Sequence, residues 1–384
     1  MKKLLALVLA LVMTLSLAVV GSNAAFKDAD KVKDTYAEAV DVLSGMGVFN
    51  GYKDGTFQPE GAITRAEVAA IVYRIYTADV KDKNISLYEG YGTFTDLAGA
   101  NWAKGYIGYC ANAGLVKGYD AKTFGPSDKV TGYQALAMIL RAMGYDKNGE
   151  FTGANWQLYV AQTAQQLGIL KNAGGESLQA PASRQLVAEL LFQAIQKPCV
   201  TYTPAFGYVA NSVVGKQDSL GVKNFGLTKT DADSSADKWG RPYYVWFDAR
   251  DTTNGKYSAT LSTVYATVKA TPDVKYTTKV TECDIASDLS LKANTVVDVY
   301  DNGDNSVVDW TIRPLATTAT KGAQGQQVEI YLLANGSYRA VVIDTYLAKV
   351  ISNTNLTYDN AGHVRTNASI ALAVYKTAVA AEAT

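Results

Sequence analysis

Apolar residues recur at helical spacing in three segments of the first two hundred positions. After Thr64, the residues at offsets four, seven, eight and eleven are Val68, Ile71, Val72 and Ile75. The same offsets after Ser183 are apolar, and a looser version follows Thr131. This spacing places the apolar side chains on one face of an α-helix. We therefore predict three amphipathic helices, each beginning just after a hydroxyl residue.

The three predicted helices start from variants of one motif. The copies read Ile63-Thr64-Arg65-Ala66-Glu67, Val130-Thr131-Gly132-Tyr133-Gln134 and Ala182-Ser183-Arg184-Gln185-Leu186. A Thr or Ser followed three residues later by Glu or Gln forms a capping box, which satisfies backbone amides at the helix start. We expect Thr64 with Glu67 and Thr131 with Gln134 to act in this way, and Ser183 to give a weaker cap. Arg65 has no part in the cap, so we interpret it as a candidate for function.

A second pattern precedes each helix and extends the repeat. Phe26-Lys27-Asp28 and Phe94-Thr95-Asp96 open two units, and each is followed by a helical segment that ends at a glycine. A turn comes next, at residues 54–59 in the first unit and 120–126 in the second. In the third unit, this turn is reduced to Leu178-Gln179-Ala180-Pro181. Such helix–turn–helix units form an internal repeat, because one unit cannot bury its own apolar face.

The order of these motifs resembles the S-layer homology (SLH) repeat over about residues 26 to 198. The likeness is specific in the first repeat, good in the second apart from Gly132, and weak in the third. It implies a helical pseudo-trimer whose grooves bind anionic, often pyruvylated, secondary cell-wall polysaccharide on a Gram-positive-type envelope. It therefore implies a secreted protein at the cell wall or in an S-layer.

The organisation of the chain follows from these patterns. Residues 1–25 have a charged start, an apolar run and small residues at the end, as in a secretory signal peptide; a retained membrane anchor is the alternative. We assign SLH repeats to 26–80, 92–146 and 150–198, a β-rich region to 199–350, and a tail or the start of a missing continuation to 351–384. The predicted fold class is thus multi-domain, with an all-α pseudo-trimer of three helix–turn–helix repeats followed by a mainly β, sandwich-like region. We expect no membrane span after signal cleavage.

The β-rich region contains two hairpin patterns. Residues 295–300 and 307–312 flank Asp301-Asn302-Gly303-Asp304-Asn305, and residues 329–333 and 338–343 flank Asn335-Gly336. The first turn resembles half of a calcium loop, but it lacks the bidentate glutamate that completes such a site. We interpret it as a plain hairpin turn.

Composition narrows the functional classes. The chain has 36 basic and 36 acidic residues, and removing Lys2 and Lys3 with the signal peptide leaves 34 against 36, a net charge near −2. Such a balance gives no global attraction to nucleic acid. The only histidine is His363, which excludes a Ser-His-Asp triad and a histidine metal cluster. No motif predicts a catalytic residue, a metal or a cofactor, so we expect a protein that is not an enzyme.

The three cysteines add little to the fold. Cys110 lies on the inward side of a predicted helix and suits a small core residue. An exported chain permits a Cys199–Cys283 bridge, with free thiols as the alternative.

Polymer binding is the best-supported chemistry. A guanidinium beside the unpaired amides of a helix start attracts a carboxylate, so we expect Arg65 and Arg184 to contact the polymer. Trp102 and Trp156 are candidates for stacking on sugar rings, with helix packing as the alternative. We expect one or two competent grooves, because the second repeat has Gly132 at the arginine position. Removing Arg65 should then weaken binding and leave the helices folded.

Two other functions stay open at this point. One is a wall-anchored enzyme, or a carbohydrate-binding or adhesin protein, with its activity in the C-terminal β region. The other is a soluble secreted binding protein whose repeats no longer hold the wall. Further copies of the chain in a lattice are a second expected partner beside the wall polymer.

Overall fold

The computed structural model describes residues 26–213, 216–230, 236–251, 262–323, 325–345, 347–354, 357–358, 364–366 and 369–375. The predicted signal peptide and His363 lie outside the described residues. The chain forms two compact units: unit 1 runs to Thr230 and includes Val245–Val268, and unit 2 comprises Asp231–Tyr244 and the residues from Lys269.

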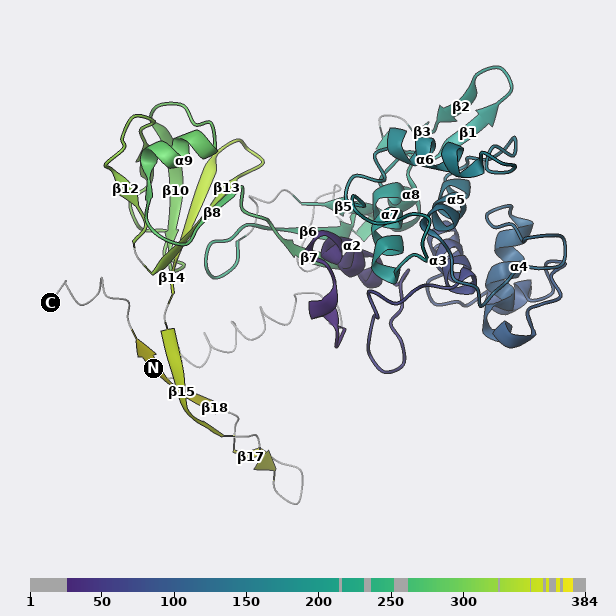
Figure 1. Ribbon diagram of the computed structural model, residues 1–384, viewed down its shortest axis with the longest axis horizontal. Helices are drawn as coiled ribbons and strands as arrows, with labels where there is room; N and C mark the ends of the chain where they lie inside the picture. The colour runs from purple at the N-terminus through teal and green to yellow at the C-terminus, as the bar shows by residue number, and fades with distance from the viewer. Residues whose placement is uncertain are drawn as a thin grey trace. The chain divides into compact units, whose positions relative to one another are not determined.

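Unit 1 is built around three pairs of helices (Figure 1). The first helices of the pairs are α2 (Asp34–Gly45), α4 (Lys104–Asn112) and α6 (Trp156–Gln166), and the second helices are α3 (Arg65–Thr77), α5 (Gly132–Ala142) and α7 (Arg184–Ile195). Short 3-10 helices are η1 (Ala29–Lys31), η2 (Ile85–Tyr88) and η3 (Ala98–Ala103). All three predicted amphipathic helices are therefore present, and each begins one residue after its hydroxyl residue.

The helix starts are capped by these hydroxyl residues. Thr64 and Glu67 form a reciprocal capping box at α3, and Thr131 and Gln134 form one at α5. At α7, the Ser183 hydroxyl accepts from the backbone amide of Leu186, and the leucine side chain cannot return a bond. The third cap is thus half of the motif.

A closed ring of backbone hydrogen bonds joins the three helix starts. Ile63 N donates to Ala182 O (3.1 Å), Ala182 N donates to Val130 O (2.8 Å), and Val130 N donates to Ile63 O (3.1 Å). All three residues are buried. Each is the residue before a cap, so the three repeats meet at equivalent positions around a pseudo-threefold axis.

The helices pack in the same cyclic order. Helix α3 packs on α4, α5 packs on α6, and α7 packs on α2, while α5 also contacts both α3 and α7. Each second helix therefore covers the first helix of the next repeat. Large side chains such as Leu43, Ile75, Ile107, Leu136 and Leu140 are almost completely buried by this packing. The apolar stripes predicted from the sequence form this shared core.

Further elements of unit 1 follow the third repeat. They are β1 (Val200–Thr203), β2 (Gly207–Ala210), β3 (Ser212–Val213), β4 (Lys216–Gln217), α8 (Leu220–Phe225), β5 (Leu227–Lys229), β6 (Tyr243–Asp248), η5 (Ala249–Asp251) and β7 (Val264–Lys269). Strands β1 and β2 form a hairpin, and β5, β6 and β7 form a sheet. Trp246 of β6 joins this sheet to the helices, because its ring lies 5.4 Å from that of Phe192 and its indole N–H donates to Glu38.

Unit 2 is centred on a five-stranded sheet of order β11-β10-β14-β13-β8 (Figure 1). The bounds are β8 (Val274–Tyr276), β10 (Thr295–Asp301), β11 (Trp310–Ile312), β13 (Gln326–Leu332) and β14 (Tyr338–Asp344). Strands β10 and β14 are parallel, and the other neighbours are antiparallel. Smaller elements are β9 (Val280–Thr281), α9 (Glu282–Asp288), β12 (Thr320–Lys321), β15 (Leu347–Thr354), β16 (Thr357–Tyr358), β17 (Val364–Thr366) and β18 (Ser369–Tyr375).

Both predicted hairpins occur in this sheet. Strands β13 and β14 pair around Asn335-Gly336, where Gly336 has φ +83° as the tight turn requires. Strand β11 begins only at Trp310, so the first hairpin has a longer connection than expected. Ile285 of α9 is buried against the sheet. The multi-domain prediction of a helical region followed by a mainly β region is confirmed, with a helix as the layer over this sheet.

Two further findings concern the whole described chain. Cys110, Cys199 and Cys283 are all free thiols, so the bridge that the sequence permitted between Cys199 and Cys283 is not formed. Among the described helices, none is long and apolar enough to cross a membrane.

The caps should contribute measurably to stability. We expect Thr64→Ala and Thr131→Ala each to lower the free energy of unfolding by about 0.5–2 kcal/mol, because an amide of the first turn loses its acceptor. Urea denaturation followed by circular dichroism measures this loss. The exposed substitution Lys53→Ala is the control and should change stability by less than about 0.5 kcal/mol. Unchanged midpoints for both threonine variants would contradict the assigned role.

Candidate ligand groove between the first two repeats

Arg65, the first residue of α3, points into the second repeat. Its Nε donates to Phe124 O (2.7 Å), and its Nη2 donates to Lys117 O (2.8 Å). The guanidinium lies 4.6 Å from the ring centre of Tyr119 and 4.7 Å from that of Phe124. Only 4% of the residue is exposed, and burial lowers the pKa of its guanidinium from the ordinary value. The interpretation of Arg65 as an arginine without a structural role was therefore wrong.

Arg184 makes the corresponding contacts from the third repeat to the first. Its Nε donates to Phe57 O (2.8 Å), and its Nη2 donates to Asn50 O (3.0 Å). The guanidinium lies 4.6 Å from the ring centre of Tyr52, and the residue is 4% exposed. The two arginines thus hold the turns of the repeats that follow them around the ring.

The aspartates of the Phe-x-Asp motifs hold the same two turns from the other side. Asp28 accepts from the backbone amides of Phe57 and Gln58, both at 2.8 Å. Asp96 accepts from those of Phe124 (3.0 Å) and Gly125 (2.7 Å). Burial opposes the ionised form of Asp96, but these hydrogen bonds outweigh it, and its pKa lies below the usual value. Phe57 and Phe124 are each bonded through both their N–H and their C=O.

Gly132 occupies the arginine position in the second repeat and faces the reduced third turn. A Cβ atom there would lie 2.7 Å from Leu178 Cδ2, which is too close for an unmoved neighbour. The amide of Tyr133 also donates to Leu178 O (3.1 Å). Leucine therefore fills the space that the side chain of an arginine would need. Glycine therefore faces the reduced turn of the third repeat, and arginine faces the full turns of the other two.

The first-turn amides of α3 are already bonded. The bonds run from Arg65 N to Asp128 O (2.9 Å), from Ala66 N to Pro126 O (3.1 Å) and from Glu67 N to Thr64 Oγ1 (3.2 Å). The same pattern holds at α7, where Arg184 N and Gln185 N donate to Gly61 O and Pro59 O. The expectation that unpaired amides attract an anion at these helix starts was wrong, because carbonyl groups of the neighbouring repeat accept these bonds.

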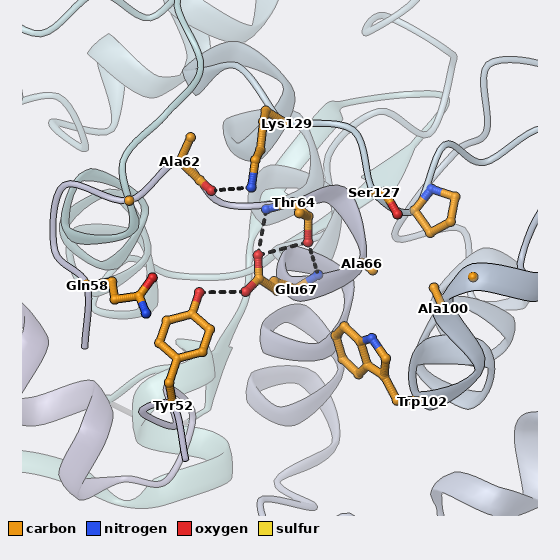
Figure 2. A pocket seen from close by; sticks show the side chains of 13 residues that line it. Tyr52, Gln58, Ala62, Thr64, Ala66, Glu67, Ala100, Trp102, Ser127 and Lys129 are labelled. Carbon is orange, nitrogen blue, oxygen red and sulfur yellow. Dashed lines mark hydrogen bonds between the residues drawn. The ribbon is translucent and has the colours of Figure 1, made fainter. Parts of the chain in front are cut away.

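A groove of about 400 Å³ lies between the first two repeats. The first repeat contributes the start of α3 and the turn before it, and the second repeat contributes η3 and the residues before α5. Figure 2 shows the rings of Tyr52 and Trp102 on either side of Glu67, with Lys129 at the top of the view. Trp102 is 56% exposed. A second pocket, of about 170 Å³, shares Tyr52, Glu67 and Trp102 with the groove and is also lined by Arg184. Trp102 therefore offers an aromatic surface to anything held in either pocket.

Glu67 is fully engaged within the groove. Its Oε1 accepts from Tyr52 OH (2.8 Å), and its Oε2 accepts from Thr64 N (2.7 Å) and Thr64 Oγ1 (2.8 Å). Burial raises its pKa, but these hydrogen bonds and the charge of Arg184 outweigh burial, so the net shift is downward. Arg184 Nη1 lies 3.6 Å from Oε1 and balances the negative charge.

Lys129 is a groove residue that the sequence analysis missed. Its Nζ donates to Ala62 O (2.8 Å), and its side chain is exposed in the groove lining. The available signal was its place in the repeat, because Lys129 stands two residues before the cap where the other copies have Ala62 and Pro181. With Glu67 balanced by Arg184, Lys129 gives this groove a positive charge.

The four predicted polymer-binding residues are therefore separated. Trp102 lines the groove, Arg184 lines the smaller pocket next to it, and Arg65 is buried in the second repeat. Trp156 begins α6, is half-buried, and is not part of the groove lining. Among the described residues, no group of three or more His, Cys, Asp or Glu side chains is placed to hold a metal ion.

Comparison with known proteins identifies the first two repeats. A family model described as the S-layer homology domain matches residues 25–69 and 93–136. Middle cell wall protein of Brevibacillus brevis is 32% identical over 149 residues, which are 38% of this chain and 14% of that protein. Surface layer protein of Brevibacillus choshinensis is 28% identical over 151 residues, 39% of this chain and 13% of that protein.

Cellulosome-anchoring protein of Acetivibrio thermocellus is 32% identical over 137 residues, which are 35% of this chain and 28% of that protein. Other similar proteins are named as enzymes, among them an amylopullulanase and an endo-1,4-beta-xylanase. The matched stretches cover less than a third of each of these relatives.

The contacts of Arg65 predict a role in stability. Arg65→Ala should lower the free energy of unfolding by roughly 1.5–3 kcal/mol, because it removes two charge-assisted hydrogen bonds from a buried site. Thermal and urea denaturation measure the change, with Lys53→Ala as the exposed control. Wild-type stability together with lost wall binding would instead support a direct contact between Arg65 and the polymer.

Proposed function

We propose that this chain, which matches the S-layer homology domain model at residues 25–69 and 93–136, anchors an exported protein to the cell wall through the groove between its first two repeats. The family and the names of the relatives indicate an extracellular, cell-wall-associated location in a bacterium of the Gram-positive type. The observation that carries the proposal is that the exposed indole of Trp102 and the ammonium group of Lys129 line one groove.

The proposed ligand is an anionic secondary cell-wall polysaccharide. The face of Trp102 offers an apolar surface for the C–H groups of a sugar ring, and the rings that border the groove are already in place before a ligand arrives. Lys129 supplies a compact positive charge for a carboxylate such as that of a pyruvate ketal. Ser127 and Gln58 line the same groove and provide neutral hydrogen-bonding groups for hydroxyls. In this arrangement, Arg65 and Arg184 act as positioning residues that hold the turns in place.

A single groove of this kind supports modest affinity. Many copies of the chain on one polymer-coated wall increase the effective affinity without any further contact. The β-rich region then faces other molecules, and we propose that it is displayed, or packs against other copies, as part of an S-layer subunit. The chain itself is proposed to have no enzymatic activity.

A wall-anchored enzyme is the second candidate, because proteins named as polysaccharide-degrading enzymes share a similar stretch with this chain. Those names describe much longer proteins, of which the matched stretch covers 10% and 8%. Release of reducing sugar from purified wall glycan by the intact chain would favour this candidate over a structural role.

The anchoring proposal is tested with purified cell-wall sacculi. Mature protein should be retained on intact sacculi and lost from sacculi stripped of secondary polymer. Trp102→Ala and Lys129→Gln should each weaken retention roughly tenfold, which corresponds to about 1.4 kcal/mol and is typical of losing one good contact. Thermal denaturation should show that both variants keep the fold, because both side chains are exposed.

Lys122→Gln is the matched control, since Lys122 is an exposed lysine of the second turn that does not line the groove. Equal retention on stripped and intact walls would disprove polymer anchoring. Retention that depends on the polymer but not on Trp102 or Lys129 would place the binding site elsewhere on the chain.

A further inference from the structure

A separate pocket of about 310 Å³ lies at the opposite end of α5 from the ring of helix starts. Helix α5 has 11 residues, so its two ends are about 16 Å apart. The pocket is lined by residues after the end of α5, by α6 and by strand β2. Its volume is at the lower end of the range for small-molecule sites. None of the residues of the proposed wall-polymer groove takes part in it.

The hairpin β1–β2 closes one wall of this pocket. The amide of Val200 donates to Met143 O (2.8 Å), and Gly144 has φ +107° with room for no side chain, since a Cβ atom would lie 2.1 Å from Val200 O. Tyr208 of β2 accepts from the amide of Lys147 (2.8 Å) through its hydroxyl oxygen. Its ring centre lies 5.1 Å from that of Tyr145. The hairpin is therefore firmly seated, and the pocket is preformed.

Two carboxylates line the pocket, and only one of them is neutralised by ion pairs. Asp146 is paired with Arg141 Nε (2.7 Å) and Lys117 Nζ (2.9 Å). Glu150 accepts from Tyr208 OH (2.8 Å) and from the side-chain amide of Asn148 (3.1 Å), both neutral donors. Within the described part of the chain, Glu150 has no ion pair. It therefore keeps an uncompensated negative charge at the pocket.

Aromatic faces and free hydrogen-bonding groups surround this charge. Tyr159 of α6 is 47% exposed and lines the pocket together with the buried Phe151. The hydroxyls of Tyr145 and Tyr159 and the amide of Gln166 make no hydrogen bond to any described residue, so they are available to a ligand. An anionic sugar would be repelled by Glu150, whereas an ammonium group would be attracted both to the carboxylate and to the tyrosine faces.

We propose that this pocket binds an amino sugar, a pyranose ring that carries an ammonium group. The ring packs on Tyr159, its hydroxyls bond to Gln166 and to the free tyrosine hydroxyls, and its ammonium group pairs with Glu150. The chemistry is the opposite of that proposed for the groove, where Lys129 selects an anionic polymer. One face of unit 1 thus takes an acidic glycan, and a separate pocket takes a basic one.

The test is titration of the mature protein with a glucosamine trisaccharide and with the N-acetylglucosamine trisaccharide at pH 6, followed by calorimetry or amide NMR. We expect the glucosamine trisaccharide to bind at least about tenfold tighter, because only it carries the charge. Free glucosamine is a third probe: binding as tight as that of the trisaccharide indicates a free sugar as ligand, and weaker binding indicates a glycan chain.

Variants separate this site from the fold and from the groove. Glu150→Gln should abolish the preference for the charged sugar, and Tyr159→Ala should weaken the binding of both trisaccharides. Leu158→Ala is the matched control, since Leu158 is the neighbouring residue on α6, is 54% exposed and does not line the pocket. Trp102→Ala should leave amino-sugar binding unchanged even though it reduces wall retention. Equal binding of the two trisaccharides, or a preference that persists in Glu150→Gln, would overturn the proposal.

Discussion

The ring of three backbone hydrogen bonds among Ile63, Val130 and Ala182 is the constraint on which the helical unit depends. All three residues are buried, so an N–H or C=O group that lost its partner there would cost about 1–3 kcal/mol. Because the ring is closed, moving one repeat breaks bonds to both of the others. The ring thereby determines where α3, α5 and α7 begin. Because Arg65, Gly132 and Arg184 are the first residues of these helices, the ring also determines which turn each of them faces.

Differences between the repeats that look independent in the sequence have one physical cause. In the first two repeats, an aspartate accepts hydrogen bonds from backbone amides of the turn, and an arginine donates hydrogen bonds to backbone carbonyls of the same turn. The third repeat lacks the aspartate and has a reduced turn, and Gly132 stands where its arginine would come from. A guanidinium buried without carbonyl acceptors would be strongly destabilising, so an arginine at this position requires the full turn of the next repeat.

Local patterns were enough to predict the helices, their caps and the hairpin at Asn335-Gly336, because those elements are determined by residues close together in the chain. The destination of Arg65 was not predictable in this way. Its acceptors, Lys117 O and Phe124 O, lie 52 and 59 residues further along the chain. The first-turn amides of α3 were expected to be free for the same reason, since their partners belong to the next repeat. Lys129 was missed because the groove that it lines exists only where the second repeat meets Tyr52, Thr64 and Glu67 of the first.

In the proposed function, stability and recognition therefore rest on different residues of the same motif. Arg65, Arg184 and the residues of the ring face inward, and changing them alters the packing of two repeats at once. The position two residues before each cap lies outside the ring and carries Ala62, Lys129 or Pro181 in the three copies. Its side chain can change without removing a bond of the ring, because the ring uses the next residue. The charge that a groove offers to a wall polymer can thus vary from repeat to repeat while the fold that forms the groove stays the same.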